Sequence, residues 1–591
     1  GGWYDKDDQL VPESEIFERY RDEVVARSGV RFFHDDGPLH DGHTPEAAVV
    51  FLDRDITFTV DDEAEARSYA DEDPQFSVAS QTAFGEWQVT RKAGAQVRVP
   101  RRATLNRRIG GLFPTDFDPA RWGVPASMLD SIDPIAVWNL VSAVDAFVSA
   151  GFSPAELLRF IHPADLACTQ GTGFGGMRSM HKLFVDRFLG EEYPQDILQE
   201  TLPNVVAAHT MQSYIGGYGS MINPVGACAT AAVSIEEGVD KIAAHKADFV
   251  VAGAIDDIQV ESIVGFGSMN ATANSQELLD RGISPRFVSR ANDRRRGGFV
   301  EAQGGGTVLL TRASVAVEMG LPVLAVVAHA QTFADGAHTS IPAPGLGALA
   351  VARGGASSPL ARSLAALGVG VDDVAFVSKH DTSTNANDPN ESDLHTRVGR
   401  ALGRSAGNPL LVVSQKTLTG HAKGGACVFQ VGGIIDAFRS GVIPANIALD
   451  CVDDKMEQYS PLVWLRSPLD LSARGPVRAA FATSLGFGHV SGFLALVHPG
   501  AFEAVVEREA GPEALARWRS ASDARLRAGS RHFEMGMLGH APLFEPVDAR
   551  RLPDDPALGA AGDPHEVEAQ MLLDPRARLG ADGYYHLPDQ Q

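Results

Sequence analysis

Cysteine is scarce in this chain, with four residues among 591: Cys168, Cys228, Cys427 and Cys451. Four scattered thiols exclude a disulfide framework, and their spacing matches no zinc-binding pattern, so we expect no metal site. The sequence also lacks an apolar run near the roughly 18 residues that a membrane-spanning helix needs. Because no secretory signal pattern opens it, we expect a cytoplasmic protein with free thiols.

Basic residues are also in deficit, with 51 Lys and Arg against 75 Asp and Glu and a formal net charge of −24. Nucleic-acid-binding proteins need a basic footprint, so this balance argues against DNA or RNA as a partner. An acidic protein partner would need a local basic patch. The arginines at 294–296 are a candidate for it, although a solvated charge run is the more common interpretation of such a cluster. The 44% of hydrophobic residues can bury a substantial core, which favours a large globular enzyme.

Cys228 stands at the start of a predicted helix. The residues after it separate into an apolar and a charged stripe at helical spacing, and the small residues Gly226 and Ala227 before it permit a sharp turn. Unpaired N–H groups at a helix start stabilise a thiolate, so this placement predicts a lowered pKa and a nucleophilic cysteine. A lone cysteine among alanines is more often plain buried packing, so the interpretation depends on companions elsewhere in the chain.

Two histidines supply those companions. His380 follows the apolar run 374–377 and His421 follows the apolar run 409–413, so each is predicted near the carboxyl end of a buried strand. Reactive groups gather at such strand ends. Either histidine alone could simply brace a loop, as most of the 18 in the chain must. Together with one thiol, however, two imidazoles are what carbon–carbon bond formation on thioesters requires.

The chain also repeats a plan of small-residue turn, apolar helix, glycine and strand. The plan covers residues 226–253 and returns at 424–447, and it predicts a helix at about 425–439. Such self-similarity indicates an internally duplicated chain. Apolar strands that alternate with helical patterns predict an α/β fold of parallel βα units with buried crossover helices.

A series of ordered motifs makes the sequence resemble the β-ketoacyl synthases over roughly residues 105–500. The motifs lie at 133–134, 171–176, 226–230, 289–301, 380–391, 415–421 and 484–488. The segments 380–388 and 301–306 look closest to type I fatty acid synthases of the fungal and actinobacterial kind. The resemblance implies a thiolase-type duplicated fold, layered αβαβα.

The resemblance also implies a role for each site residue. Cys228 would carry the acyl chain as a thioester, and its N–H and that of Phe487 would form an oxyanion pocket. His380 and His421 would bind the malonyl thioester carbonyl and stabilise the enolate that forms as carbon dioxide leaves. The reaction would be a decarboxylative Claisen condensation of malonyl-ACP with the acyl chain from acyl-ACP, giving 3-oxoacyl-ACP. No cofactor is expected in this region, because phosphopantetheine arrives on the acyl carrier protein (ACP).

Further residues are expected to support these groups. Lys416 and Glu391 fit a pair that orients the histidine loops. An ion pair that only braces two loops would be hard to tell from such a pair. Phe487 lies between Gly486 and Gly488, and it fits an aromatic gate whose flanking glycines let the backbone swing.

Three places depart from the wider family. Asp381 stands where glycine is usual, so the loop either accepts a left-handed aspartate or is shifted. Its carboxylate next to His380 would favour an imidazolium. His489 also replaces a usual glycine, and residues 291–292 are Ala-Asn in place of Pro-Phe. We expect these departures to affect substrate fit more than chemistry.

The sequence predicts three parts, at 1–104 (adaptor), 105–500 (ketosynthase, with halves at about 105–320 and 321–500) and 501–591 (C-terminal extension). The chain begins Gly-Gly-Trp without methionine, which suggests an excised piece of a longer protein. One helix is predicted at 501–519, followed by a Pro/Asp/Ala-rich wrapping or contact segment. By resemblance, the protein would form a homodimer within a larger synthase assembly.

Three alternatives stay open. A degradative thiolase would need a second cysteine in the glycine loop at 486–492, which has none, and Cys427 lies inside a predicted helix. A chalcone-synthase-like enzyme would have asparagine where His421 stands. A catalytically inactive, synthase-like scaffold would be expected to have lost Cys228.

Overall fold

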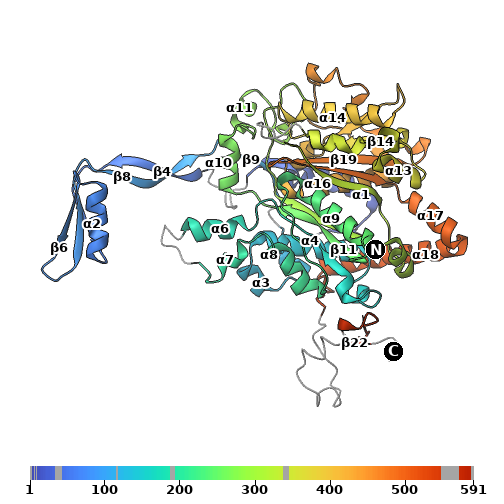
Figure 1. The fold of residues 1–591 in the computed structure, drawn as a ribbon, viewed down its shortest axis with the longest axis horizontal. Coiled ribbons are helices and arrows are strands. Elements are labelled where there is room, and N and C mark those ends of the chain that lie inside the picture. Colours follow the sequence, from blue (N-terminus) through green and yellow to red (C-terminus); the bar gives the residue numbers. More distant parts are fainter. Residues whose placement is uncertain are drawn as a thin grey trace, which may run out of the picture. The chain divides into compact units, whose positions relative to one another are not determined.

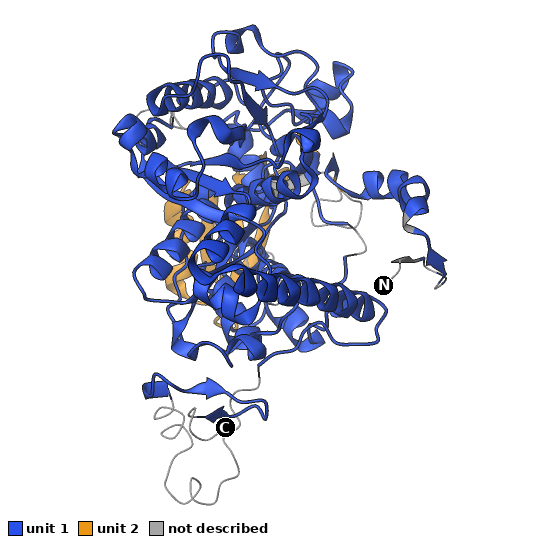
Figure 2. Ribbon diagram, turned by 90° about the vertical axis from the view of Figure 1, so that its right-hand side faces the viewer, with its two compact units in different colours: residues 1–32, 109–591 blue, residues 33–108 orange. Residues whose placement is uncertain are grey.

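The computed structural model describes residues 3–5, 7, 9–33, 43–114, 117–186, 193–336, 345–547 and 572–586. The chain divides into two compact units, of residues 1–32 with 109–591 (unit 1) and of residues 33–108 (unit 2) (Figure 2). The N-terminal residues therefore belong with unit 1, because β3 (Val30–Phe32) pairs with β9 (Ile109–Gly111). This division differs from the predicted boundaries at 104 and 500, which stay predictions.

Unit 2 consists of antiparallel strands and one helix. Strands β4 (His43–Phe51) and β8 (Gln96–Thr104) form a two-stranded ladder. A second sheet has the order β5-β7-β6, from Ile56–Val60, Trp87–Arg91 and Ser77–Gln81. Helix α2 (Glu63–Glu72) begins at Asp62, whose carboxylate accepts the N–H of Glu65.

Unit 1 is built on two sheets. The first has the order β10-β11-β12, from Leu166–Cys168, Phe249–Asp256 and Gly304–Thr311. The second has the order β13-β20-β19-β14-β15-β17, from Val326–Ala334, Val490–Val497, Ala479–Gly486, Val374–Ser378, Leu410–Val413 and Leu462–Trp464. Strand β14 is parallel to both β15 and β19. The strands predicted at 374–377 and 409–413 are confirmed as the neighbours β14 and β15.

Two apolar helices fill the space between the sheets. Helices α9 (Thr230–Ala243) and α16 (Ala426–Ser440) lie between β11 and β19 (Figure 1). Alternate residues of β11 face opposite sides, because strand side chains have a period of two. Val250 and Ala252 pack in the core shared with these helices, whereas Phe249 and Val251 face the core on the other side of the sheet.

Further helices cover the outer faces. On the first sheet lie α4 (Pro134–Ala150) and α8 (Val205–Thr210), and on the second α13 (Pro359–Ala366) and α14 (Asn387–Leu402) (Figure 1). The predicted αβαβα layering is therefore confirmed. Asp133 caps α4 at its start, and Gly151, with φ of 76°, ends the helix.

The remaining described elements are shorter or connect these layers. They are α1 (Glu13–Arg27), α3 (Ala126–Ser131), α5 (Pro154–Leu157), α6 (Met177–Phe184), α7 (Ile197–Glu200), α10 (Val260–Ser268), α11 (Ser275–Asp280), α12 (Ala313–Met319), α15 (Lys416–Thr419), β1 (Trp3–Tyr4), β2 (Leu10–Val11), β16 (Val442–Ile443), β18 (Leu469–Asp470), β21 (Arg578–Leu579) and β22 (Tyr585–His586). Among the described residues, none of the helices is both long and apolar enough to cross a bilayer.

The internal repeat is visible, with one difference. Short 3-10 turns, η5 (Ala227–Ala229) and η10 (Lys423–Gly425), precede α9 and α16. After α9 the chain enters the long strand β11, but after α16 it forms only the two-residue β16, which pairs with β18 outside the main sheets. The strand predicted at 442–447 is therefore too long, because Pro444 follows β16 and cannot donate to a ladder.

The C-terminal segment packs into unit 1. The single helix predicted at 501–519 is wrong, because Gly511, with φ of 85°, separates α17 (Gly500–Ala510) from the longer α18 (Pro512–Met537). Trp518 is buried in the core of the first sheet and donates its Nε1–H to Leu321 O at 3.0 Å. Residues 548–571 and 587–591 of the predicted Pro/Asp/Ala-rich contact segment lie outside the described residues.

Two helix-interior glycines test whether α18 packs on α4. A Cβ on Gly529 would lie 2.2 Å from Val148 O, whereas a Cβ on Gly432 of α16 would meet nothing within 4 Å. Alanine favours a helix over glycine by about 1 kcal/mol, so we expect Gly432→Ala to raise the free energy of unfolding by up to about that amount. Gly529→Ala should lower it by about 1–3 kcal/mol through steric overlap. Urea denaturation measures both, and equal stabilisation by the two changes would contradict the α4–α18 contact.

Candidate active site

The turn before Cys228 is tight and closely packed. Ala227 has a left-handed φ of 47°, and Thr230 closes the turn by accepting the N–H of Gly226 at 3.0 Å and donating to Ala227 O at 2.7 Å. Gly486, at the end of β19, lies against this turn, since a Cβ there would be 2.3 Å from Gly226 O. Glycine at 486 therefore permits the close approach of β19 to the Cys228 turn.

Cys228 faces a cavity of about 250 Å³ whose walls also include His380, His421 and Phe487. His421 Nε2 is 3.1 Å from Cys228 Sγ, and the rings of His380 and His421 are perpendicular with centroids 5.1 Å apart. The structure thus brings Cys228, His380 and His421 together, although they come from three distant parts of the chain. Cys427, in contrast, lies in α16, is 1% exposed and does not line this cavity.

His380 is held from both sides of its backbone. Glu391 of α14 accepts the N–H of His380 at 2.5 Å and that of Asp381 at 2.8 Å. Lys416 Nζ donates to His380 O at 2.5 Å and to its Nδ1 at 3.3 Å. An ammonium can only donate, so Nδ1 accepts and the neutral ring carries its proton on Nε2. Lys416 and Glu391 therefore hold His380 separately, and the described ion pairs do not join the two directly.

His421 is fixed by a neighbouring segment. Its N–H donates to Val300 O at 2.7 Å, and its carbonyl accepts the N–H of Ala302 at 3.0 Å. Two residues later, Lys423 Nζ lies 3.1 Å from Glu301 Oε2, and both side chains are buried. Sequence reasoning assigned no role to Lys423 or Glu301, although a lysine in a glycine-rich turn is a signal that could have found the pair.

Burial sets the protonation of both histidines. It lowers the pKa of His380 and of His421 well below the ordinary value, and the positive charge of Lys416 lowers both further. The imidazolium predicted for His380 is therefore wrong. The reason is that Asp381 turns its carboxylate away, toward Lys379, Asn292 and Ser414. Both rings are neutral at physiological pH and can offer one N–H each.

Burial also controls the thiol. It raises the pKa of Cys228 to about 12, while Lys416 lowers the pKa, Asp256 raises it further, and Lys423 and the N–H of Phe487 lower it. The lowered pKa predicted from the helix start is thus wrong in direction, because the helix start is buried. The resting thiol is protonated, and His421 Nε2 is placed to accept its proton.

Phe487 lies in the turn that connects β19 and β20. Its N–H lowers the pKa of the Cys228 thiol, the direction expected of an oxyanion-pocket donor beside that sulfur. Its ring stacks on Phe266 with centroids 5.7 Å apart. Gly488 and His489 follow with φ of 83° and 67°, so the turn has left-handed backbone on one side of the ring. The gating role of Phe487 stays a prediction.

Two other expectations concern charged side chains. Arg296 is buried and pairs with Asp453 at 2.6 Å, and Arg295 pairs with Asp450, so the basic patch predicted at 294–296 does not form. Asp256 was missed, although a carboxylate at the end of the apolar strand β11 is a recognisable signal. Its oxygens accept N–H groups from Gly173, in the predicted N-terminal half, and from Gly424, in the predicted C-terminal half.

Comparisons with known families decide the identity of this arrangement. A profile described as "Beta-ketoacyl synthase, N-terminal domain" matches residues 78–316, and one described as "Beta-ketoacyl synthase, C-terminal domain" matches residues 324–450. The chain belongs to the β-ketoacyl synthase family. The N-terminal match begins inside unit 2, ahead of the ketosynthase start that the sequence predicted at 105.

The relatives are fatty acid synthases. The chain is 33% identical to "Fatty acid synthase 2" of Mycosarcoma maydis, over 99% of this chain and 15% of that protein. It is 29% identical to the fatty acid synthase subunit alpha of Saccharomyces cerevisiae, over 98% of this chain and 35% of that protein. The chain therefore spans about a third or less of the length of the curated relatives it matches. The resemblance to fungal type I fatty acid synthases is confirmed.

A solved structure confirms the fold. The noncanonical ketosynthase FabY from P. aeruginosa superposes with a TM-score of 0.78 at 21% sequence identity, covering 94% of this chain and 86% of that one. The predicted thiolase-type ketosynthase fold is therefore present.

The buried thiol predicts a steep pH dependence of alkylation. A Cys451→Ser variant removes the exposed thiol. In this variant, we expect the rate of Cys228 labelling by iodoacetamide to rise roughly tenfold per pH unit from about pH 7 to about pH 9, because only the thiolate reacts. Peptide mapping by mass spectrometry gives the rate, with buried Cys168 and Cys427 as unlabelled internal controls. A plateau above about pH 7.5 would instead show a thiolate stabilised by the helix start.

Proposed function

We propose that the chain catalyses the decarboxylative condensation of a malonyl thioester with an acyl group carried on Cys228, as the elongation step of fatty acid synthesis. The observation that carries the proposal is the meeting of one thiol and two neutral imidazoles in a single cavity, with His421 Nε2 3.1 Å from Cys228 Sγ. The membership of the β-ketoacyl synthase family supports it.

Acyl transfer is the first step. His421 Nε2 takes the thiol proton, and Cys228 Sγ attacks the carbonyl carbon of the incoming acyl thioester. The N–H groups of Cys228 and Phe487 hold the oxyanion. When the tetrahedral intermediate collapses, the carbon–sulfur bond to the carrier breaks and the departing thiolate takes the proton back. The acyl group is then a thioester of Cys228.

Decarboxylation and condensation follow. The malonyl thioester oxygen accepts the Nε2–H of His380 and that of His421 in its Nε2–H tautomer. The bond to the carboxylate breaks, carbon dioxide leaves, and the electron pair forms the enolate that these two donors stabilise. The enolate carbon attacks the carbonyl of acyl-Cys228, the carbon–sulfur bond breaks, and the Cys228 thiolate that leaves takes a proton from water. The product is a 3-oxoacyl thioester.

The carrier of both acyl groups is part of the same proposal. We infer that acyl-ACP and malonyl-ACP deliver them on phosphopantetheine, and that the chain holds no cofactor of its own. The hydroxyls of Thr382 and Thr384 line the cavity and offer hydrogen bonds to the amides of a phosphopantetheine arm. A cytoplasmic location and a larger synthase assembly belong to the proposal too, the latter because the relatives are much longer synthases.

Degradative thiolase activity is the second candidate that the sequence left open. It needs a second cysteine beside the nucleophile, and among the residues that line the cavity Cys228 is the only one. The nearest alternative in sequence terms, Cys427, is buried in α16. Condensation is therefore the better supported direction.

A homodimer also belongs to the proposal. Residues 220–222 extend the first sheet beyond β10, because Cys168 N–H donates to Ser220 O at 2.9 Å and Ile222 N–H donates to Cys168 O at 3.0 Å. Met221 on this edge segment is 43% exposed, and Val225, three residues beyond the segment, is 59% exposed. An apolar sheet edge just before Cys228 is suited to a self-complementary contact with a second copy.

Partial reactions test the division of roles. Cys228→Gln places an amide where the acyl thioester would be, so this variant should still release carbon dioxide from a malonyl thioester while forming no condensation product. His380→Ala and His421→Ala should each lose decarboxylation by about 10²–10³, the usual cost of removing one oxyanion donor. Labelled carbon dioxide release by the purified variants is the measurement. Equal loss in Cys228→Gln and His380→Ala would overturn the assignment.

The edge segment predicts how the dimer can be broken. Val225→Asp should convert dimers to monomers, because it puts a charge into an apolar contact. Leu324→Asp is the control, since Leu324 is 47% exposed and lies away from this edge, before β13. Sedimentation equilibrium measures the mass of each variant. If Val225→Asp stays dimeric, or the parent chain is monomeric, the proposed contact is wrong.

A further inference from the structure

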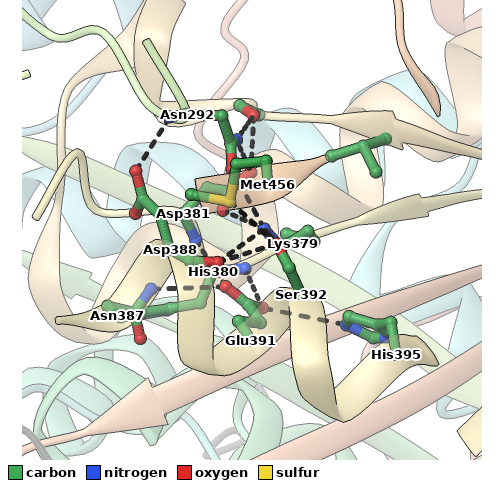
Figure 3. A network of polar contacts seen from close by, with 12 residues as sticks. Asn292, Lys379, His380, Asp381, Asn387, Asp388, Glu391, Ser392, His395 and Met456 are labelled. Carbon is green, nitrogen blue, oxygen red and sulfur yellow. Dashed lines mark hydrogen bonds and ion pairs between the residues drawn. The ribbon is translucent and has the colours of Figure 1, made fainter. Parts of the chain in front are cut away.

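His380 lies between two residues of opposite charge whose side chains are completely buried. Lys379 Nζ is 2.6 Å from Asp381 Oδ1, and both side chains are 0% exposed (Figure 3). Asp381 has a φ of 33°, a left-handed conformation that aspartate tolerates better than most residues but that remains unfavourable. The chain therefore turns sharply just after His380, and the ion pair spans the turn.

A second contact locks Asp381 in this turn. Asn292 Nδ2 donates to Asp381 Oδ2 at 2.7 Å, and Ser414 Oγ donates to the same oxygen at 2.6 Å. Asn292 is itself left-handed, with φ of 60°, and its N–H donates to Asp388 Oδ2 at 2.8 Å. Two places where the sequence departs from its wider family, 381 and 292, are thus direct hydrogen-bond partners.

The charge of Lys379 depends on its surroundings. Burial alone lowers its pKa, but the carboxylates of Asp381, Glu391 and Asp388 together raise the pKa above the ordinary value, so the side chain is an ammonium. Its Nζ also donates to Ser392 Oγ at 2.9 Å (Figure 3). A buried charge without its partner is strongly unfavourable, which ties the position of Lys379 to that of Asp381.

We propose that Lys379, Asp381 and Asn292 are positioning residues that fix the direction in which His380 presents its Nε2–H to the cavity. This inference rests on the proposed condensation. Glu391 and Lys416 hold the N–H and the carbonyl of His380, whereas the Lys379–Asp381 pair fixes the residues on either side of it. Neither Lys379 nor Asp381 lines the cavity, so both act through His380.

Loss of this positioning should slow one of the two partial reactions and spare the other. A displaced His380 removes one of the two donors that stabilise the enolate, so decarboxylation slows. Acylation of Cys228 uses His421 and the N–H groups of Cys228 and Phe487, which lie on other segments, so it is spared. A purely structural network would instead affect both partial reactions together with stability.

Two isosteric variants and their combination test the inference. Asp381→Asn retains the left-handed tolerance and removes the charge, and Lys379→Met retains the length of the side chain. Each single change leaves one buried charge without its partner. We expect it to lower kcat of carbon dioxide release by about 10-fold to 10²-fold, which is the effect of displacing a catalytic group by about 1 Å. KM should be nearly unchanged. The double variant removes both charges, so its loss should be smaller than the product of the two single losses.

The second readout is the rate at which an acyl thioester loads Cys228, followed by intact mass. We expect it to change by less than about twofold in all three variants, because His380 takes no part in that step.

Phe147→Leu, in the apolar core of the first sheet, is a control that lowers the melting temperature without altering the network. If Asp381→Asn fails to fold, Asn292→Gly replaces it, since glycine accepts the φ of 60° while deleting the amide.

Each outcome decides the matter. Unchanged carbon dioxide release in Asp381→Asn or in Asn292→Gly overturns the positioning role. The positioning role is also overturned if a variant loses both partial reactions in proportion, to the extent that Phe147→Leu does at the same loss of melting temperature. That result would show a structural role. If the unmodified chain releases no carbon dioxide, the proposed function itself fails. This result differs from failure of the positioning role, in which the unmodified chain is active.

Discussion

The reactive groups of this protein are enclosed away from water, and the rest of the site depends on that enclosure. In a medium of low polarity an isolated charge is unfavourable, so titratable groups become neutral or find partners. Burial drives Cys228 toward the thiol and both histidines toward neutral imidazole. Several of the charges that remain occur as close pairs, such as Lys379 with Asp381 and Lys423 with Glu301. Neutral hydrogen-bond donors beside a protonated nucleophile are what a thioester condensation requires.

The duplicated fold brings these groups together. Two equivalent helix starts, η5 before α9 and η10 before α16, meet in the middle layer between the sheets. Asp256 accepts N–H groups from Gly173 and Gly424, and a Cβ on Gly424 would lie 2.7 Å from that carboxylate. The repeats can approach so closely only because the turns are made of small residues. Cys228 from one half therefore faces His421 from the other.

Much of the layered core could be predicted from the sequence, because local periodicity decides it. The apolar run at 374–377 is too short for a typical helix and is therefore interpreted as a buried strand. Asp133 and Gly151 mark the ends of α4 by ordinary capping rules. Helix α18 was missed beyond residue 519, because its charged sequence hides the stripe that includes Trp518 and Gly529. The pairing of β3 with β9, which assigns residues 1–32 to unit 1, joins segments too far apart in sequence to leave a local pattern.

Within the site, motifs predicted which residues meet but gave the wrong protonation states. The pKa of Cys228 depends on burial by β19 and the Phe487 turn, which are remote in sequence from α9. The direction of the Asp381 carboxylate depends on Asn292 and Ser414, so adjacency to His380 was misleading. Tertiary contacts of this kind leave no local pattern.

The central claim is that Cys228 carries an acyl group which a malonyl thioester then removes by carbon–carbon bond formation. Intact-mass and peptide mass spectrometry test it in one experiment, with an acyl thioester added first and a malonyl thioester second. The account predicts an acyl adduct confined to Cys228 that disappears on the second addition, as a 3-oxoacyl thioester appears. No adduct, an adduct on another residue, or one that persists after malonyl thioester is added would contradict it.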